Sequence, residues 1–358
     1  MAHWRKVLPA ACALVLACAG VTALTLRSRA TREASATLYA MSTVVTSRAW
    51  GAHAQEAVDA VTQALAEHEA RLSLYEPDSD IARLNAAAGS SPVEIAPETY
   101  ALLEKGKALS LQNPGEFALT IAPVTLAWGV NSDAPRVVPE DERRQLLALV
   151  DDNALVLKDG TAMLTQEGMG VDLGGIAKGA ACDVAREVYE DLGVENALLD
   201  IGGNVYARGR RPDGTRFRIG FRDPNGNAAS AIAVLELEDE VIAVSGGYER
   251  YFEVDGVRYS HIFDPATAAP AQSDLASVGV VCEDGATADF YSTALYVGGL
   301  EKTLEYMERG GTAIALTNDG RLYVSQALRD SFSWAEGGED AYPLYWVTAK
   351  REDAHEAA

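Results

Sequence analysis

Hydrophobic residues recur in four stretches of the chain with the period of an α-helix. From residue 54 to residue 72, apolar side chains return every three or four positions, which predicts an amphipathic helix. A second helix is expected over residues 97–112, because Pro97 can occupy a first helical turn without losing a hydrogen bond. Two further helical stretches are predicted at residues 176–192 and 286–309, the latter broken at Gly298-Gly299.

The second half of the chain is punctuated by Asp-Gly pairs that stand between apolar or alternating runs. Asp-Gly is a favoured two-residue turn between antiparallel strands. Four hairpins are therefore predicted, at Asp159-Gly160, Asp213-Gly214, Asp255-Gly256 and Asp319-Gly320. Hairpins with helices between them indicate an α+β fold, in which helices pack on antiparallel, hairpin-rich sheets, and not a doubly wound parallel sheet. We expect one body over residues 36–347 and an acidic, frayed tail over residues 348–358.

Residues 1–35 form a segment of a different kind. Twenty residues without a charge lie between Lys6 and Arg27, which is about the length that spans a bilayer. This segment is predicted to target or anchor the chain. Three outcomes remain open: retention as a signal anchor, which the length of the run favours, cleavage after Ala17-Cys18-Ala19, or lipidation of Cys18. Each of them places the body outside the cytoplasm, on the periplasmic side of the membrane.

Charge and cysteine content exclude several classes of protein. The 358 residues include 30 Lys and Arg against 52 Asp and Glu, a net charge of −22. Nucleic acid is excluded as a partner, because binding a polyanion requires clustered cations. Outside residues 1–35, the cysteines are Cys182 and Cys282, and neither belongs to a C-x-x-C motif. Both are expected to be small buried residues and not redox or zinc ligands.

The common catalytic signatures are absent from the sequence. It has no G-x-S-x-G, H-E-x-x-H or P-loop motif. Beyond residue 35 there are four histidines. His53 is expected at a helix start, His68 on an exposed helix face and His355 in the tail. His261 is therefore the candidate for acid–base chemistry.

Two glycine pairs break the local hydrophobic pattern. In residues 171–181, VDLGGIAKGAA, a strand is predicted to end at Asp172 and a helix to begin after two glycines. Such a junction can offer free N–H groups to a phosphate, or can simply be a tight turn, and both interpretations stay open. In residues 197–209, Gly202-Gly203 is better explained as a bend where another backbone approaches.

A third segment, residues 285–299, places oxygen atoms on one face of a predicted helix. Asp289, Ser292 and Thr293 stand at positions i, i+3 and i+4. A carboxylate with hydroxyls at this spacing suits a hard cation such as Mg²⁺. Taken alone, the segment is better explained by helix capping with a hydroxyl bonded to the preceding turn.

Together these segments resemble the ApbE family, the FAD:protein FMN transferases. The resemblance rests on ordered motifs that run from Met41 to about Gly299: MSTVVTSRAWG, RLSLYEPDSDIARLN, FALTIAPVTLAWG, DLGGIAKG, LLDIGGN, AVSGGYERYFEVDGVRYSHIFDP and ADFYSTAL. It implies a two-lobed, T-fold-like body. It also implies a Mg²⁺-dependent enzyme, often exported and anchored to the membrane, that takes FAD as substrate. The family moves the FMN half of FAD to a Thr or Ser hydroxyl of an acceptor flavoprotein and releases AMP.

The resemblance also assigns roles to individual residues. His261 would be the general base, although a buried imidazole satisfied by backbone remains the alternative. The metal ligands would be Gly175, Asp289, Ser292 and Thr293. The FAD site would be lined by Met41, Tyr75, Ala118, Leu119, Thr120, Asp172, Lys178 and Phe263.

Three positions depart from the family pattern and affect cofactor affinity more than reaction type. Ala118 stands where the family usually has Asp, which removes one polar contact to the flavin or the metal shell. Gly247 replaces an Asp or Asn, and Thr267-Ala268-Ala269-Pro270 replaces a T-G-x-P turn. Two other functions stay open: an FAD pyrophosphatase, in which water replaces the acceptor hydroxyl, and a lipoprotein that binds FAD without turnover.

Overall fold

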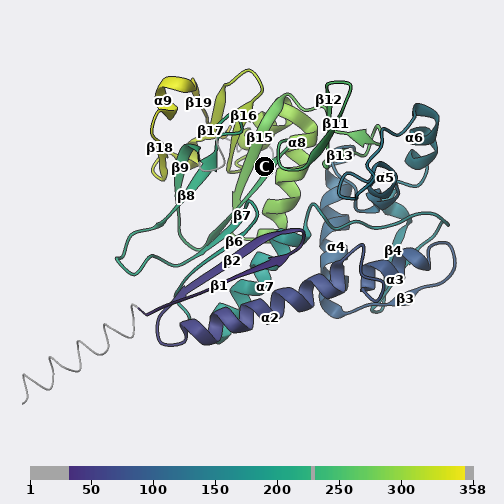
Figure 1. Cartoon of the computed structure of the whole chain (residues 1–358), viewed down its shortest axis with the longest axis horizontal. Coiled ribbons are helices and arrows are strands. Elements are labelled where there is room, and N and C mark those ends of the chain that lie inside the picture. The colour runs from purple at the N-terminus through teal and green to yellow at the C-terminus, as the bar shows by residue number, and fades with distance from the viewer. Residues whose placement is uncertain (1–31, 227–229, 351–358) are drawn as a thin grey trace, which may run out of the picture.

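The computed structural model describes residues 32–226 and 230–350, so the predicted leader, apart from its last residues, and the end of the tail lie outside the described residues. The α+β architecture predicted from the sequence is confirmed (Figure 1). Within the described residues, no helix has both the length and the apolar character to cross a bilayer.

A nine-stranded sheet forms the centre of the molecule. Its neighbouring strands are antiparallel except for the last pair, which is parallel. In spatial order the strands are β1 (Glu33–Ala40), β2 (Thr43–Trp50), β6 (Asn196–Ile201), β7 (Asn204–Arg208), β10 (Glu240–Gly246), β15 (Leu275–Cys282), β16 (Ala313–Thr317), β17 (Leu322–Ser325) and β19 (Leu344–Val347).

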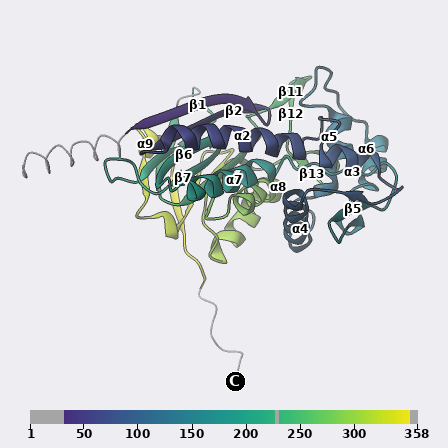
Figure 2. The ribbon, with the colours of Figure 1, turned by 90° about the horizontal axis from the view of Figure 1, so that it is seen from below.

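Three helices cover one face of this sheet, as Figure 2 shows: α2 (Ala54–Leu72), α7 (Ala177–Asp191) and α8 (Gly285–Glu308). The periodicity predicted all three, because each buries an apolar stripe on the sheet. The other face packs against a three-stranded sheet of β8 (Phe217–Arg222), β9 (Ala231–Leu237) and β18 (Phe332–Trp334), with the short α9 (Gly338–Ala341) beside it.

A second lobe, at the end of the molecule where α2 terminates, has its own core. It contains α3 (Asp80–Ala86), α4 (Pro97–Gln112), α5 (Ala122–Trp128), α6 (Glu140–Leu147) and a small sheet of β3 (Val93–Glu94), β4 (Leu155–Lys158) and β5 (Thr161–Leu164). Beside α5 lie the hairpin of β11 (Tyr251–Val254) and β12 (Val257–Ser260) and the pair β13 (Phe263–Asp264) and β14 (Ala269–Pro270). Single 3-10 turns occur at Leu119–Ile121, Asp152–Ala154 and Gln326–Leu328.

Helix α8 joins the two lobes because it is buried on both sides. Leu295 packs in the core under the large sheet, whereas Phe290 packs in the second core, with its ring 4.5 Å from that of Phe117. The predicted break is confirmed at Gly299, where φ is 75°. A side chain at Gly299 would approach Asp274 Oδ1 to 2.6 Å, so glycine is required at this bend.

Three of the four predicted hairpins form, and one does not. The turns at Asp159-Gly160, Asp255-Gly256 and Asp319-Gly320 each join two paired strands. At Asp213-Gly214 the prediction was wrong, because β7 before it and β8 after it belong to different sheets. The turn there is local, with the Arg211 N–H donating to the Thr215 carbonyl at 2.8 Å.

The strand predicted to end at Asp172 is also absent. The segment is extended but has no neighbouring strand in the described structure. Instead the Asn85 side chain bonds both the N–H and the carbonyl of Val171, at 2.7 and 2.9 Å, and so satisfies the backbone as a strand would. The glycine pair Gly202-Gly203 forms the turn between β6 and β7, and a side chain at Gly202 would meet Thr43 Oγ1 at 2.1 Å. The predicted bend is confirmed, and the backbone that approaches it is that of Val244, whose N–H donates to the Gly203 carbonyl at 3.2 Å.

Candidate functional site

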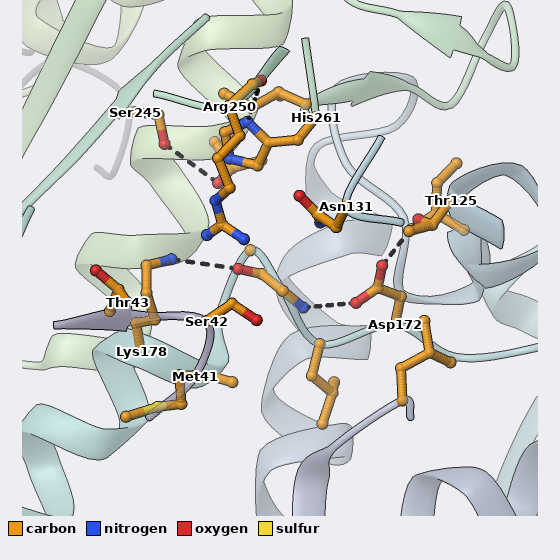
Figure 3. Close-up of a pocket in the computed structure, with 18 of the residues that line it drawn as sticks. Met41, Ser42, Thr43, Thr125, Asn131, Asp172, Lys178, Ser245, Arg250 and His261 are labelled. Carbon is orange, nitrogen blue, oxygen red and sulfur yellow. Dashed lines mark hydrogen bonds between the residues drawn. The ribbon is translucent and has the colours of Figure 1, made fainter. Parts of the chain in front are cut away.

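A cavity of about 430 Å³ lies where the two lobes meet (Figure 3). Its walls come from the β1–β2 turn, the end of α2, the start of α7, the end of β10 and the segment after β12. The cavity brings together nine of the thirteen site residues predicted from the sequence: Met41, Tyr75, Ala118, Asp172, Gly175, Lys178, His261, Phe263 and Thr293. The other four, Leu119, Thr120, Asp289 and Ser292, are buried behind its lining.

His261 is fixed by the main chain of Arg250. Its N–H donates to the Arg250 carbonyl at 3.0 Å, and its ring Nδ1 lies 3.2 Å from the same oxygen. A carbonyl oxygen only accepts, so the neutral imidazole carries its proton on Nδ1 and keeps the lone pair of Nε2 free. Burial, together with the positive charges of Arg250 and Lys178, lowers the pKa of His261 to about 3. The ring is therefore neutral and able to accept a proton.

Lys178 connects the glycine turn to a buried carboxylate. Its Nζ donates to the Gly174 carbonyl at 3.3 Å and lies 3.5 Å from Asp289 Oδ1. Asp172 holds the same turn, since its Oδ1 accepts the Gly174 N–H at 2.9 Å and its Oδ2 accepts the Thr125 hydroxyl at 2.8 Å. The start of α7 thus presents a cation and a fixed glycine turn to the cavity, an arrangement suited to a phosphate.

Asp289 lies at a close crossing of α7 and α8. Its side chain is 2% exposed, and its Oδ2 accepts the Gly179 N–H at 2.9 Å. The helices approach this closely because glycine stands on both: a side chain at Gly179 would come within 2.0 Å of the Gly285 carbonyl. Neither glycine could be replaced without separating Asp289 from α7.

Four oxygen-bearing residues gather next to this carboxylate. Ser292 donates back to the Asp289 carbonyl at 2.9 Å, the bond to the preceding turn expected of a serine inside a helix, and lies 2.9 Å from the Ser245 hydroxyl. Ser245 is also 3.4 Å from the Thr293 hydroxyl, and Gly175 packs against Thr293. Within the described residues no cluster of three or more His, Cys, Asp or Glu could hold a metal. A cation here would be held by one carboxylate and neutral oxygens, a donor set that fits Mg²⁺ bound jointly with a phosphate.

Comparison with known proteins agrees with this geometry. Residues 37–316 match the model of the ApbE family. The chain belongs to the ApbE family. The ApbE relatives include an FAD:protein FMN transferase of Treponema pallidum, 33% identical over 296 residues, which are 78% of this chain and 82% of the relative. Another, from Vibrio cholerae, is 32% identical over 279 residues, 76% of this chain and 84% of the relative.

Solved ApbE structures have the same fold. The crystal structure of the ApbE protein of Thermotoga maritima aligns with a TM-score of 0.78 at 28% identity, over 84% of this chain and 99% of the other. The flavin transferase ApbE of Vibrio cholerae aligns with a TM-score of 0.75 at 27% identity, again over 84% of this chain and 99% of the other.

The departures from the ApbE pattern have physical explanations at two of the three positions. A side chain at Gly247 would come within 2.3 Å of the Tyr296 hydroxyl, so this tyrosine takes the space of the usual Asp or Asn. Ala268 stands where the pattern has glycine and adopts a left-handed conformation, with φ of 50°, which glycine takes most readily; its carbonyl accepts the Trp128 indole N–H at 2.8 Å. Ala118 lines the cavity without a polar group, and nothing else in the structure explains the substitution.

Some residues at the site were missed or misjudged from the sequence. His68 was predicted on an exposed helix face, but it is 4% exposed, its Nε2 lies 2.9 Å from the Ala177 carbonyl, and it lines the cavity. Its position three residues after Leu65, on the apolar stripe of α2, was the signal that could have placed it correctly. Arg250 and Ser245 were within a quoted motif and were not singled out. Cys182 is buried, as predicted, and Cys282 is half-buried.

Asp152 was missed because no motif surrounds it. It is 5% exposed and accepts four hydrogen bonds, from the Ser110 hydroxyl, the Leu119 N–H, and the N–H and hydroxyl of Thr120, at 2.6 to 2.9 Å. Leu119 and Thr120 are thereby held behind the cavity wall that Ala118 lines. The carboxylate fixes this loop from behind.

Proposed function

We propose that this protein transfers the FMN half of FAD to a Thr or Ser hydroxyl of an acceptor protein and releases AMP. The observation that carries the proposal is a neutral, oriented imidazole, His261, in one cavity with Lys178, the Gly174–Gly175 turn and Thr293. The names of the Treponema and Vibrio relatives support the same reaction. Met41, Tyr75 and Phe263 supply apolar surface for the flavin in the same cavity.

The reaction places distinct demands on the chain's own residues. The acceptor hydroxyl oxygen attacks the phosphorus of the FMN half while its proton passes to Nε2 of His261. The bond from that phosphorus to the bridging oxygen breaks, and AMP leaves with the bonding electron pair and the bridging oxygen. Lys178 counters the negative charge of the diphosphate, and the Asp172-braced turn at Gly174 holds the start of α7 in position to bind it.

We further propose that Mg²⁺ binds beside Asp289, with Gly175, Ser292 and Thr293 as the remaining protein oxygens. When bound, Mg²⁺ neutralises charge on the diphosphate and makes AMP a better leaving group. Ser245 belongs with this set because its hydroxyl contacts both Ser292 and Thr293. Thr293, Gly175 and Ser245 line the cavity, so their oxygens are within reach of a metal–FAD complex.

The site of action is proposed to be the periplasmic side of the membrane. The basis is the uncharged run between Lys6 and Arg27, which would anchor the body through residues 1–35. A reporter enzyme fused after residue 60 tests this, because activity only in the cytoplasm would contradict export.

One incubation distinguishes the possible activities. The protein is mixed with FAD, Mg²⁺ and a candidate acceptor, and AMP and protein-bound flavin are measured. AMP with covalently yellow acceptor supports transfer. AMP with free FMN and no labelled acceptor indicates a pyrophosphatase, and binding of FAD without AMP indicates a non-catalytic flavin carrier.

A further inference from the structure

A second hollow, of about 410 Å³, adjoins the candidate FAD cavity. We call it the outer groove. Four of its lining residues, Ser42, Asn131, Glu249 and Arg250, also line the FAD cavity, and Figure 3 shows three of them, Ser42, Asn131 and Arg250, converging. Its remaining lining residues are Tyr39, Val130, Ser132 and Tyr251. The groove and the FAD cavity are therefore continuous.

Exposed apolar side chains flank the outer groove on two hairpins. On the β1–β2 hairpin, Tyr39 is 74% exposed, and Val44, directly opposite it, is 58% exposed. On the β11–β12 hairpin, Tyr251 is 43% exposed, and its ring is held by the Arg258 guanidinium 4.1 Å away. Aromatic side chains gathered at the mouth of a site in this way are typical of a surface that binds another molecule.

The charge and shape of the groove limit what can bind there. The negative charge of Glu249 is compensated by Arg222, 3.1 Å away. Arg250 is the only positively charged residue in the lining of the groove. A polyanion or a strongly basic segment would find no matching charge. Tyr39 lies on β1, the outermost strand of the large sheet in the part of the chain described, and such an edge can pair with an extended peptide.

We propose that the outer groove binds the acceptor polypeptide as an extended segment without clustered charge, with apolar side chains against Tyr39 and Tyr251 and its Thr or Ser directed past Arg250 toward His261. This inference rests on the proposed function. The main chain of Arg250 holds His261, and the side chain of Arg250 lines both hollows. A hydroxyl that enters from the groove therefore passes the residue that positions the base.

The test uses the full chain, FAD, Mg²⁺ and a library of short peptides with one fixed central Thr and random flanking residues. Covalent flavin fluorescence selects the peptides that are modified. The variants are Tyr39→Ser and Tyr251→Ser, with Tyr345→Ser as the matched control, since Tyr345 is 45% exposed on the distant strand β19. FAD affinity and AMP release without peptide are measured for each protein.

We expect selected peptides to carry apolar residues in their flanks and no clustered charge. Both groove variants should raise the peptide KM by about tenfold, the loss typical of an interface anchor. FAD affinity and peptide-free AMP release should stay at wild-type levels, and Tyr345→Ser should behave as wild type. An unchanged peptide KM in the groove variants would overturn the inference. AMP release with free FMN and no peptide modified would instead refute the proposed transfer, because it indicates a pyrophosphatase.

The remaining outcomes separate this inference from its basis. If the wild-type protein binds FAD but neither modifies a peptide nor releases AMP, the proposed function itself fails. If Tyr39→Ser instead converts a dimer to a monomer in sedimentation, the groove is covered by a second copy of this chain and not by an acceptor.

Discussion

The Arg250 carbonyl oxygen receives both the main-chain N–H of His261, at 3.0 Å, and its ring Nδ1, at 3.2 Å. These residues flank the β11–β12 hairpin, in which Tyr251 pairs with Ser260. The His261 ring is therefore fixed where the two strands of the hairpin meet the rest of the chain. The imidazole cannot turn without breaking its contact with the Arg250 carbonyl. An imidazole held in this way would need no reorganisation to act as the proposed base when the acceptor arrives.

Replacing His261 with Ala should separate chemistry from binding. Transfer to an acceptor hydroxyl should fall by roughly 10²- to 10⁴-fold, as expected for a lost general base. FAD affinity should change little, because the proposed diphosphate contacts come from Lys178 and the turn at Gly174, which bond to each other and not to His261. Fluorescence quenching gives the FAD dissociation constant, and the rate of covalent flavinylation gives the chemistry. Loss of affinity with an unchanged rate per bound FAD would make His261 a binding or core residue.

The pH dependence of kcat/KM for FAD should differ from that of kcat. Burial, Arg250 and Lys178 lower the pKa of His261 to about 3 in the free protein, so the ring stays neutral until the pH falls near that value. Accordingly, kcat/KM for FAD should have no acid limb near pH 6.5 from this residue. Bound diphosphate opposes the two cations and raises the pKa, so an acid limb should appear in kcat, which reports the complex.

Arg250→Gln provides the comparison for this pH dependence. Removing one of the two cations raises the pKa of His261 in the free protein, so its protonation midpoint should move upward. A titration of the imidazole nitrogens by NMR measures this directly. A wild-type midpoint near 6.5 that does not move in Arg250→Gln would contradict the assignment.

Local sequence predicted the elements well and their long-range partners less well. The helix predicted over residues 54–72 is confirmed as α2, Ala54–Leu72. The prediction succeeded because the spacing of the apolar residues matches the face of the helix that is buried. The Asp213-Gly214 turn was wrongly predicted to form a hairpin, because the local sequence does not indicate that the strands before and after it belong to different sheets. His68 was predicted to be exposed because an imidazole is polar, yet the packing of α7 on α2 covers it.

For the candidate site too, the sequence identified residues within local motifs but not those that support them from a distance. His261, Lys178 and Thr293 lie in motifs whose residues are neighbours in sequence, and the cavity contains all three. Asp152 supports the 118–120 loop from over thirty residues away and sits in a single 3-10 turn without a recognisable pattern. A supporting carboxylate of this kind becomes visible only once the chain is folded.

Asp152→Asn tests that support. Asparagine keeps one acceptor oxygen, but its NH₂ group replaces the second carboxylate oxygen. The two donors that bonded to that oxygen now face another donor, so at least one N–H or hydroxyl is left unpaired. The free energy of unfolding should fall by about 2 to 3 kcal/mol, the range for a lost charge-assisted hydrogen bond with a buried orphan. FAD should also bind more weakly, because Ala118 would no longer be fixed. The neighbouring Asp151→Asn is the control: Asp151 is exposed and only caps its own turn, at Asn153. Equal losses in the two variants would contradict the role of Asp152.

Asp289→Asn should create a metal-dependent defect. The substitution removes the only carboxylate of the proposed Mg²⁺ set and places an amide near Lys178, so AMP release at limiting Mg²⁺ should be largely lost and partly recovered at high Mg²⁺. Asp284→Asn at the N-cap of the same helix is the control. Asn can still cap α8 at the Thr287 N–H, so the substitution removes only the ion pair with Lys105 and should cost at most about 1 kcal/mol of stability without changing the Mg²⁺ response. Wild-type turnover of Asp289→Asn at limiting Mg²⁺ would refute the metal site.

His68 should make the fold sensitive to acid. Burial lowers its pKa to about 4, against 6.5 for an exposed histidine, although the hydrogen bond to the Ala177 carbonyl opposes the shift. Between these two values the unfolded chain binds a proton that the folded chain does not, so the free energy of unfolding falls as the pH drops from about 6.5 to about 4. A shift of this size corresponds to about 3 kcal/mol.

His68→Gln isolates this contribution, since glutamine can still donate to the Ala177 carbonyl but does not titrate. The variant should lose about 3 kcal/mol less stability than the wild type between pH 7 and pH 4, measured by urea unfolding at each pH. His53→Gln is the matched control at the other end of α2, where the side chain is 59% exposed, and it should keep the wild-type acid loss. Parallel losses of stability in His68→Gln and the wild type would contradict this prediction, because the buried ring would then be protonated in the folded protein as readily as in the unfolded chain.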